Sequence, residues 1–491
     1  MHYILPADRQ QFTFMRSLDD MVAPDHYVRL LDALVDSVIS ANPKSFLYKG
    51  QHNAGRRAFS PATMLKLYLY GYFNSIKSSR KLERETHRNI EVIWLLGNLT
   101  PDHKSISDYR KDNPESIKFI TKQFRHFLKD NGYIKGELVA LDGTKVKANS
   151  NRDMLTLKKI ENRLTGLDEK IEGYLRTLLE NDRIEDLFED ETSDDDPDQP
   201  NHTNQRLLDK IAALTEQAEK LKEQKRLLEE QSGDYLSPSD PDAQLMKSRD
   251  GKIPAYNVQS VVDEANQMIA HTEVFSNPED VTLLEPMLDA LAEEMQIVPD
   301  AAATDGGYHN IAQIESIEER QSTTCYVPIP KHKSDCSEVT FSYDKDQNEY
   351  RCSEGKRLTL KQKNKPKNGQ LCDVYQGIEC KGCALRSKCT ESKHGRMIYR
   401  YHNYEWREQY RRRMASPIAR QMMQIRKQIV EHPFGTIKYW MGKIPLLLRG
   451  KVGVTTEINI YSTAYNFRRL LSIESFQDIL EMIHQYHWKI A

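Results

Sequence analysis

The 491-residue chain has no run of eighteen apolar residues, so its sequence predicts no membrane-spanning helix. Residues 1–6 (MHYILP) lack the charged segment and the apolar core of a secretory signal. We therefore expect a cytoplasmic protein that does not bind membranes. Hydrophobic residues make up 38% of the chain and charged residues 29%, a polar composition that is still that of a globular protein. The length suits two to four domains.

The chain also has no large excess of positive or negative charge, since its formal net charge is −2. This balance hides two opposite segments. Residues 182–198 hold ten acidic residues and one Arg, whereas residues 331–410 hold 17 Lys and Arg against 11 Asp and Glu. A locally basic segment in a near-neutral chain permits nucleic-acid binding without requiring it. A solvated basic face is the alternative interpretation.

Cysteine is scarce, and all seven cysteines lie between residues 325 and 389. In a cytoplasmic chain, such clustering favours metal binding over disulfides. Four of them, including a C-x2-C pair, have a spacing that suits a structural zinc site: Cys352, Cys380, Cys383 and Cys389. An iron–sulfur cluster and unmetallated thiols are the alternatives. The remaining three are expected to take no part in metal binding: Cys325, Cys336 and Cys372.

Two aspartates each follow a short apolar run. Residues 137–145 (ELVALDGTK) predict a buried central strand that ends at Asp142, because the run is too apolar for a solvated face. The pattern recurs in residues 298–308 (VPDAAATDGGY), which contain Asp305. A third carboxylate, Glu431, lies in a helix-like segment. Two strand-end aspartates and one helical glutamate form the set that a two-metal phosphoryl-transfer site needs.

The order of the predicted elements indicates an α/β fold with an RNase H-like core. After a helical region, three strands able to pair antiparallel are followed by helix, strand, helix and strand. This order predicts a mixed five-stranded sheet with flanking helices, its strands at 137–145, 255–263, 267–274, 299–304 and 323–328. The N-terminal helices either bind DNA as a helix-turn-helix or form a bundle used for packing or dimerisation.

Two heptad-like seams interrupt this core. They are Leu157, Ile160, Leu164, Leu167, Ile171, Tyr174 and Leu178, and then Leu207, Ile211, Leu214, Ala218, Leu221 and Leu228. Apolar residues at alternating spacings of three and four predict an antiparallel coiled-coil hairpin. Its linker is the acidic run 182–198, which we expect to be mobile. A structural or protein–protein role is expected for the hairpin.

These features divide the chain into five parts. They are a helical DNA-binding or dimerisation domain at 1–130, an RNase H-like catalytic domain at 131–153, 236–330 and 401–470, the coiled-coil insertion at 154–235, a basic Cys-rich insertion at 331–400, and a C-terminal helix at 471–491.

Several basic residues lie near the predicted carboxylates in the sequence and are candidates for contacts to DNA phosphates. They are Lys145, Arg411, Arg412, Arg426, Lys427 and Lys438. An i,i+4 surface salt bridge is the alternative role for Lys427, because it shares a helix face with Glu431. Four lysines of the Cys-rich insertion, expected in a loop, are further candidates: Lys361, Lys363, Lys365 and Lys367.

Six short motifs follow one another in an order that resembles bacterial insertion-sequence transposases of the DDE class. They are LDGT (141–144), DPDA (240–243), YNVQ (256–259), TDGGY (304–308), VEHPFGTIK (430–438) and AYNFRR (464–469). The resemblance covers nearly the whole chain. It implies an RNase H-like core whose catalytic triad is Asp142, Asp305 and Glu431. Asp242 is the reserve carboxylate.

Related transposases carry a Tyr-x2-Arg-x3-Glu-x6-Lys signature. Glu431 and Lys438 match it, whereas Lys427 stands in place of Arg and Gln424 in place of Tyr. The phosphate-contacting role of the signature Arg therefore passes to another basic residue, for which Arg426 is the candidate.

The resemblance also implies the reaction and the partners. We expect cleavage and strand transfer of DNA with two Mg²⁺ ions, which Mn²⁺ can replace. The DNA would be the terminal inverted repeats of an insertion sequence and a double-stranded target, bound by a homodimer in the bacterial nucleoid. Two other functions stay open: a non-catalytic DNA-binding protein derived from a transposase, and an RNase H-like endonuclease without strand transfer.

Overall fold

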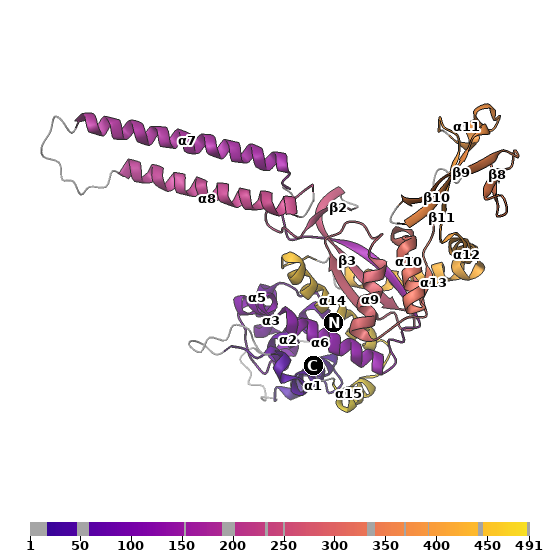
Figure 1. Cartoon of the computed structure of the whole chain (residues 1–491). Coiled ribbons are helices and arrows are strands. Elements are labelled where there is room, and N and C mark those ends of the chain that lie inside the picture. The colour runs from indigo at the N-terminus through magenta and orange to yellow at the C-terminus, as the bar shows by residue number, and fades with distance from the viewer. Residues whose placement is uncertain are drawn as a thin grey trace, which may run out of the picture.

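The computed structural model describes residues 17–46, 58–151, 154–188, 202–230, 234–248, 251–330, 339–367, 370–390, 392–439 and 445–488. Most of the acidic linker from residue 189 onward and Cys336 lie outside the described residues. Within them, no helix is both long and apolar enough to cross a bilayer. Figure 1 shows a central body from which a helical hairpin and a small β-rich module project in different directions.

The N-terminal region is helical, as predicted. Its helices are α1 (Tyr27–Ala41), α2 (Pro61–Phe73), α3 (Ser79–Arg88), α4 (Ile90–Leu95), α5 (His103–Asp112) and α6 (Pro114–Asp130), with short 3-10 turns η1 (Asp19–Met21) and η2 (Pro43–Phe46). Local sequence fixes several of the helix starts. Ser60 accepts a hydrogen bond from the amide of Thr63 ahead of Pro61, and Asp102 accepts from Lys104 and Ser105.

The central sheet has six strands, one more than predicted. They are β1 (Leu138–Lys147), β2 (Gln244–Ser248), β3 (Gly251–Asp263), β4 (Ile269–Phe275), β5 (Ala301–Ala303) and β6 (Thr324–Tyr326). The order is β2-β3-β1-β5-β6, and β4 also pairs with β3. The additional strand is β2. Helices α9 (Leu284–Met295) and α10 (Ile311–Gln321) connect β4 to β5 and β5 to β6.

The first strand, β1, is longer than expected. Strand β1 does not end at Asp142 but continues to Lys147, because it pairs antiparallel with β3 along its whole second half. Its parallel partner β5 is the strand that stops. The last parallel pair is Ala140 with Ala303, so one side of β1 is free of a neighbouring strand from there on.

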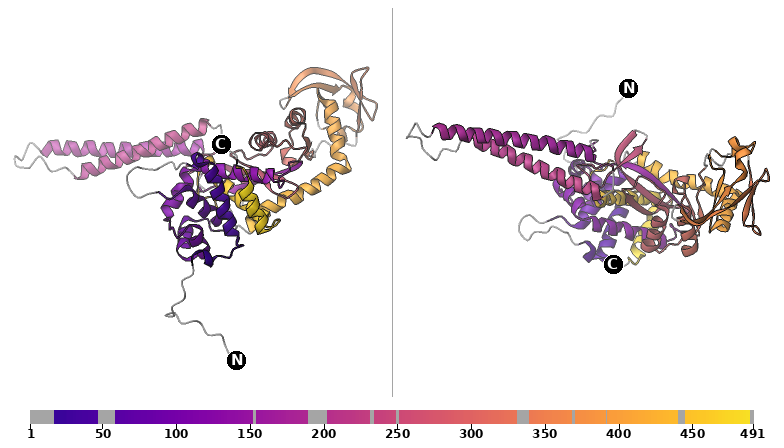
Figure 2. Two further views of the ribbon diagram at one scale, coloured as in Figure 1. Left: turned by 90° about the horizontal axis from the view of Figure 1, so that it is seen from below. Right: turned by 45° about the horizontal axis from the view of Figure 1, so that its top comes forward.

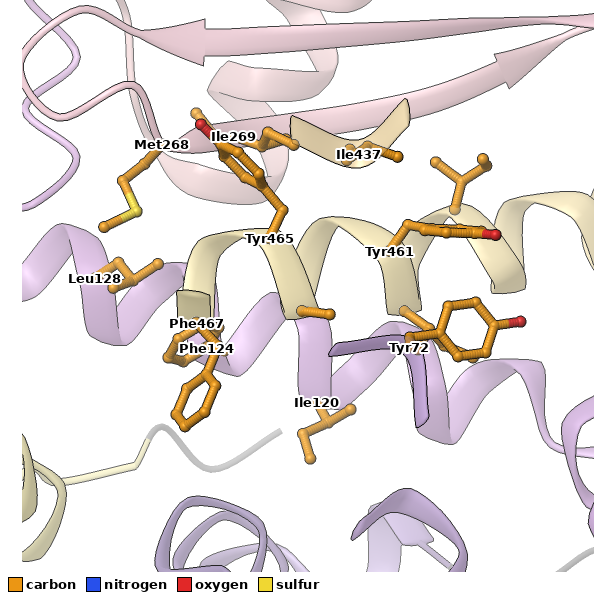
Figure 3. Packing of buried hydrophobic residues seen from close by; sticks show 14 of the residues in the cluster. Tyr72, Ile120, Phe124, Leu128, Met268, Ile269, Ile437, Tyr461, Tyr465 and Phe467 are labelled. Atoms are coloured by element: carbon orange, nitrogen blue, oxygen red, sulfur yellow. The ribbon is translucent and has the colours of Figure 1, made fainter. Parts of the chain in front are cut away.

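One buried helix, α14 (Gly450–Leu471), joins the N-terminal helices to the sheet. It packs against α2 and α6 on one side and β4 on the other. Figure 3 shows Tyr461 beside Tyr72, and Tyr465 beside Ile269. Arg125 of α6 adds a buried polar link, because it donates to Thr272 of β4 and to Ser462 of α14. The N-terminal helices and the sheet therefore share one hydrophobic core.

The two predicted insertions project from this body (Figure 2). The first is an antiparallel pair of long helices, α7 (Leu157–Phe188) and α8 (His202–Glu230). Most seam residues are buried or half-buried between the helices, as predicted, whereas Leu157 is exposed. The base is closed by a small cluster of Leu155, Ile160, Leu228 and Leu236.

The second insertion is an antiparallel five-stranded sheet. Its strands are β7 (Phe341–Asp344), β8 (Glu349–Cys352), β9 (Arg357–Lys367), β10 (Gln370–Gly377) and β11 (Met397–Tyr401), with η5 (Glu379–Gly382) and α11 (Arg386–Cys389) between the last two. The loop expected for these lysines is wrong, because all four belong to β9. Lys361 and Lys363 are exposed there, whereas Lys365 and Lys367 are half-buried. The chain then returns through α12 (Tyr404–Ala415) and α13 (Pro417–Tyr439), and ends with α15 (Phe476–Gln485).

Glu457 of α14 is a buried carboxylate at the junction with the N-terminal helices. It accepts hydrogen bonds from the amides of Leu447 and Leu448. Burial raises its pKa from 4.5 to about 7, although those amides, Arg110 and Lys77 lower it. Between pH 4.5 and 7 the unfolded chain therefore loses this proton while the folded chain keeps it. Folding stability falls as the pH rises through this window.

We predict that Glu457→Gln removes this pH dependence. Relative to the variant, wild-type protein should lose about 3 kcal/mol of stability between pH 4.5 and pH 8, the equivalent of its raised pKa. Unfolding in urea at several pH values measures the difference, with Glu481→Gln on exposed α15 as the control. Identical pH dependence in wild type and Glu457→Gln would contradict the buried-proton interpretation.

Candidate active site

Two predicted carboxylates occupy equivalent positions along the neighbouring parallel strands β1 and β5. Asp142 lies two residues beyond Ala140 on β1, and Asp305 lies two residues beyond Ala303 at the end of β5. Since Ala140 and Ala303 are register partners, both aspartates lie just beyond the last β1–β5 pair, at the edge of β1 that β5 leaves unpaired. Asp305 turns the chain there, because its carboxylate caps η3 (Gly306–Tyr308) by accepting from the amide of Gly307 at 2.8 Å.

Asp142 forms an ion pair with a basic residue of α13. Arg426 of α13 donates through Nη2 to Asp142 Oδ1 at 2.8 Å, and its side chain is only 13% exposed. Burial raises the pKa of Asp142, Arg426 lowers it, and the nearby charges of Asp305 and Asp280 raise it. The net direction is upward, so this carboxylate holds its proton more strongly than a solvated aspartate does.

A third carboxylate, Asp280, borders the same region from the loop between β4 and α9. Its Oδ1 accepts from Lys145 Nζ at 3.0 Å, Asn257 Nδ2 at 2.6 Å and Gln259 Nε2 at 2.9 Å. Asn257 and Gln259 are two residues apart on β3, so their side chains face the same side of the sheet. Their register partners on β1 are Lys145 and Gly143. The sequence pattern did not single out Asp280, whose only local signal is the polar turn that follows β4.

Tyr308 is a buried residue next to these aspartates. Its buried hydroxyl donates to Gln259 Oε1, the other end of the amide that contacts Asp280. Burial raises the pKa of the phenol, and the charges of Asp280, Asp142 and Asp305 raise it further. One buried ring therefore experiences the field of all three aspartates.

Glycine keeps room between the carboxylates. A Cβ on Gly307 would stand 2.9 Å from Asp305 Oδ1 and 3.8 Å from Asp280 Oδ2. The two oxygens thus flank a space that any side chain would fill. A space flanked by carboxylate oxygens suits a hard divalent cation such as Mg²⁺, which prefers oxygen ligands.

The remaining predicted carboxylate is not part of this arrangement. Glu431 is exposed on α13, whereas the neighbouring Ile429 and Val430 are buried on the face that packs into the core. Lys427, one turn before Glu431, is exposed on the same side of the helix. The reserve carboxylate Asp242 is also apart, since it accepts from the amide of Lys451 at the start of α14.

The predicted DNA-contacting residues fall into two groups. Lys145 and Arg426 lie inside the site, where each is paired with an aspartate. Arg411 and Arg412 are exposed on α12, and Arg411 also contacts Glu408. The side chain of Lys438 lies outside the described residues. Lys427 of α13 is exposed as well.

No three His, Cys, Asp or Glu side chains in the described part of the chain form a ready-made metal site. In the carboxylate region, Arg426 contacts Asp142 Oδ1 and Lys145 contacts Asp280 Oδ1. Binding of a divalent ion would need the carboxylates to shift toward one another and Arg426 to be displaced from Asp142.

The four predicted zinc ligands converge from separate elements of the second sheet. They line one cavity: Cys352, Cys380, Cys383 and Cys389. The pKa of Cys389 is raised, first by burial and then by the other three sulfurs, while Arg396 lowers it. Cys325 is a buried thiol in β6 whose pKa burial raises to about 12, in keeping with the expected inert role. Cys372 is buried in β10 away from that cavity.

Two family models match the chain. A transposase domain (DUF772) matches residues 16–112, and a transposase DDE domain matches residues 351–471. The second match includes Glu431 and α14 but begins after Asp142 and Asp305. No curated protein matches the sequence.

One solved structure shows a weak likeness. The cryo-EM structure of the piggyBac transposase synaptic complex with hairpin DNA aligns with a TM-score of 0.32 and 8% identity. The alignment covers 94% of this chain and 79% of that chain. A likeness this low supports no statement about fold or chemistry.

An N-terminal transposase domain followed by a DDE domain defines a transposase. The two matches support an insertion-sequence transposase of the DDE class, as its motifs indicated. DDE domains occur in DNA-cleaving enzymes that typically use divalent metal ions.

We predict that Gly307→Ala closes the space between Asp305 and Asp280. The added methyl group would stand closer to Asp305 Oδ1 than contact distances allow, so the carboxylate must move. Calorimetric titration with Mn²⁺ should show a loss of affinity of about tenfold or more, the range seen when support around metal ligands is removed. Gly306→Ala is the matched control, because its methyl group would meet only Pro328 at ordinary distances. Equal Mn²⁺ affinity in both variants would exclude a metal between these oxygens.

Proposed function

We propose that this transposase binds the terminal repeats of its insertion sequence and carries out metal-dependent cleavage and strand transfer of DNA. The observation that carries the proposal is the level placement of Asp142 and Asp305 beside the uncovered edge of β1. Antiparallel β4-β3-β1 followed by parallel β5 and β6 is the strand order expected of an RNase H-like catalytic core.

Asp142, Asp305 and Glu431 are the proposed ligands of two Mg²⁺ ions. The ions would activate water or a 3′-hydroxyl and stabilise the leaving 3′-oxygen. Asp142 and Asp305 both lie two residues beyond the last β1–β5 pair, whereas Glu431 would join them only after α13 turns or bends. Pro433 lies within α13 two residues later and weakens the helix there, because it lacks an amide donor.

The basic residues have two roles in this proposal. Arg426 holds Asp142 in place and is released toward a DNA phosphate once cations occupy the site. Exposed Arg411, Arg412 and Lys427 bind the DNA backbone from outside, with Lys438 as a further contact. We further propose that the enzyme acts as a homodimer on paired ends in the bacterial nucleoid, and that the α7–α8 hairpin contributes to pairing.

We predict that Asp142→Asn and Asp305→Asn each abolish cleavage of a labelled duplex that carries an end of the element. DNA binding, measured by gel shift, should stay intact because no DNA-contacting cation is removed. Asp300→Asn is the matched control, since Asp300 is exposed and precedes β5 at its other end. Glu431→Gln tests the third proposed ligand in the same reaction.

The products distinguish the proposed reaction from its alternatives. Joining of the cut end to a second duplex establishes strand transfer, whereas nicking without joining would indicate a nuclease. Binding without cleavage by the wild type, in Mg²⁺ and in Mn²⁺, would contradict the enzymatic proposal and favour a non-catalytic DNA-binding protein.

We propose structural zinc for the Cys-rich module. Four sulfurs from β8, η5 and α11 and the turn between the last two line one small cavity, and four thiolates complete a tetrahedral zinc shell. Zinc would tie the end of β8 to the segment between β10 and β11.

We predict one zinc per chain in purified protein, by mass spectrometry of the metal content. Cys383→Ser should reduce the zinc content to background and lower the thermal stability of the module. Cys372→Ser should retain zinc, because Cys372 donates to the carbonyl of Lys365 outside the cavity and Ser can replace that donor. Wild-type protein free of zinc and iron, with the four thiols reactive, would overturn the proposal.

A further inference from the structure

Asp280 lies in the carboxylate region without a role in the DDE triad. It belongs to the connection between β4 and α9, and its contacts with Lys145, Asn257 and Gln259 place it over the pair of strands β1 and β3. Its side chain is 25% exposed, so it is accessible to solvent while held by these three donors.

The two oxygens of Asp280 differ in their surroundings. All three donors that contact the carboxylate bind Oδ1: Lys145, Asn257 and Gln259. Among the described residues, none donates a hydrogen bond to Oδ2. That second oxygen borders the space at Gly307, which Asp305 Oδ1 borders as well. One oxygen of Asp280 is thus fixed by protein donors, and the other lies near Gly307, as Asp305 Oδ1 does.

This division is the one expected for a metal-ligating carboxylate. Such ligands are oriented by hydrogen bonds from surrounding residues, which leave the coordinating oxygen aimed at the ion. The supporting residues are themselves fixed. Gln259 is held by the hydroxyl of Tyr308, and Gly143 has no side chain that would block Gln259.

The charge balance favours the same role. Among the described residues, two cations form ion pairs with the three aspartates: Arg426 pairs with Asp142, and Lys145 pairs with Asp280. All three carboxylates raise the pKa of buried Tyr308, so their charges act on one small volume. A divalent cation would neutralise the excess. Glu431, in contrast, is exposed on α13.

We infer that Asp280 is a ligand of the catalytic divalent ion, binding through Oδ2 beside Asp305. The inference rests on the proposed metal-dependent cleavage and adds a carboxylate to its site. Lys145 then orients Asp280 through Oδ1 and is not free to bind a phosphate.

The first test is calorimetric titration of the full chain with Mn²⁺. Asp280→Asn keeps an oxygen for Lys145, Asn257 and Gln259 but removes the charge, so we expect Mn²⁺ affinity to fall at least about tenfold. Glu279→Gln is the matched control, since Glu279 is the adjacent carboxylate and is exposed. Thermal unfolding of each variant verifies that the fold is retained.

A second variant separates a ligand from a residue that only supports the fold. Asp280→Cys places a soft thiolate at the site, which Mg²⁺ binds poorly and Mn²⁺ accepts better. We expect DNA cleavage by Asp280→Cys to be lost in Mg²⁺ and recovered at least about tenfold in Mn²⁺ relative to Mg²⁺, after correction for the wild-type ratio. Equal loss in both metals would overturn the ligand role.

Asp142→Asn, measured alongside, distinguishes the two levels of inference. If Asp142→Asn retains metal binding and cleavage, the proposed function itself fails. If Asp142→Asn loses both while Asp280→Asn binds Mn²⁺ as wild type does, only the role of Asp280 is overturned.

Discussion

The parallel pairing of β1 with β5 is the constraint on which the rest of the site depends. Only three residue pairs join the two strands, from Leu138 and Ala301 to Ala140 and Ala303. Because β5 stops there while β1 continues with β3, the sheet acquires an edge in its interior. Asp142 reaches this edge from a strand that is rigidly paired on its other side, and Asp305 reaches it from the turn that ends β5. A shift of one residue in this register would turn Asp142 to the other face of the sheet.

The electrostatics of the site follow from this geometry. Carboxylates that lie close together repel one another, which costs free energy unless cations pair with them. Arg426 comes from α13 and Lys145 from β1 itself, so protein cations stabilise the site from both sides. A divalent ion would exchange with Arg426, which makes occupation of the site a competition between the metal and this side chain.

The insertions leave the core intact because each begins and ends beside it. The α7–α8 hairpin departs after β1 and returns before β2, with Leu155 and Leu236 paired at its base. The Cys-rich sheet departs after β6 and returns into α12. Helix α14 then passes through the middle of the body and packs on both the N-terminal helices and β4. Loss of α14 would therefore separate the helical region from the sheet.

The sequence alone determined the local features. Apolar runs around Leu141 and Ala302 predicted buried strands, heptad spacing predicted the α7–α8 hairpin, and the C-x2-C pair predicted a cysteine cluster that does converge. Motif order identified the family. These succeed because periodicity, capping and short spacing depend on neighbouring residues.

Only the tertiary structure decided the contacts between distant segments. No spacing in the chain indicates that Arg426 meets Asp142, that Asp280 turns one oxygen toward Asp305, or that Glu431 lies on an exposed helix face. Strand β1 passes Asp142 because β3 supplies its hydrogen bonds, and β3 lies beyond an insertion of about eighty residues. Such pairings are set by how whole elements pack, so the residues that complete this site could be found only once the chain was folded.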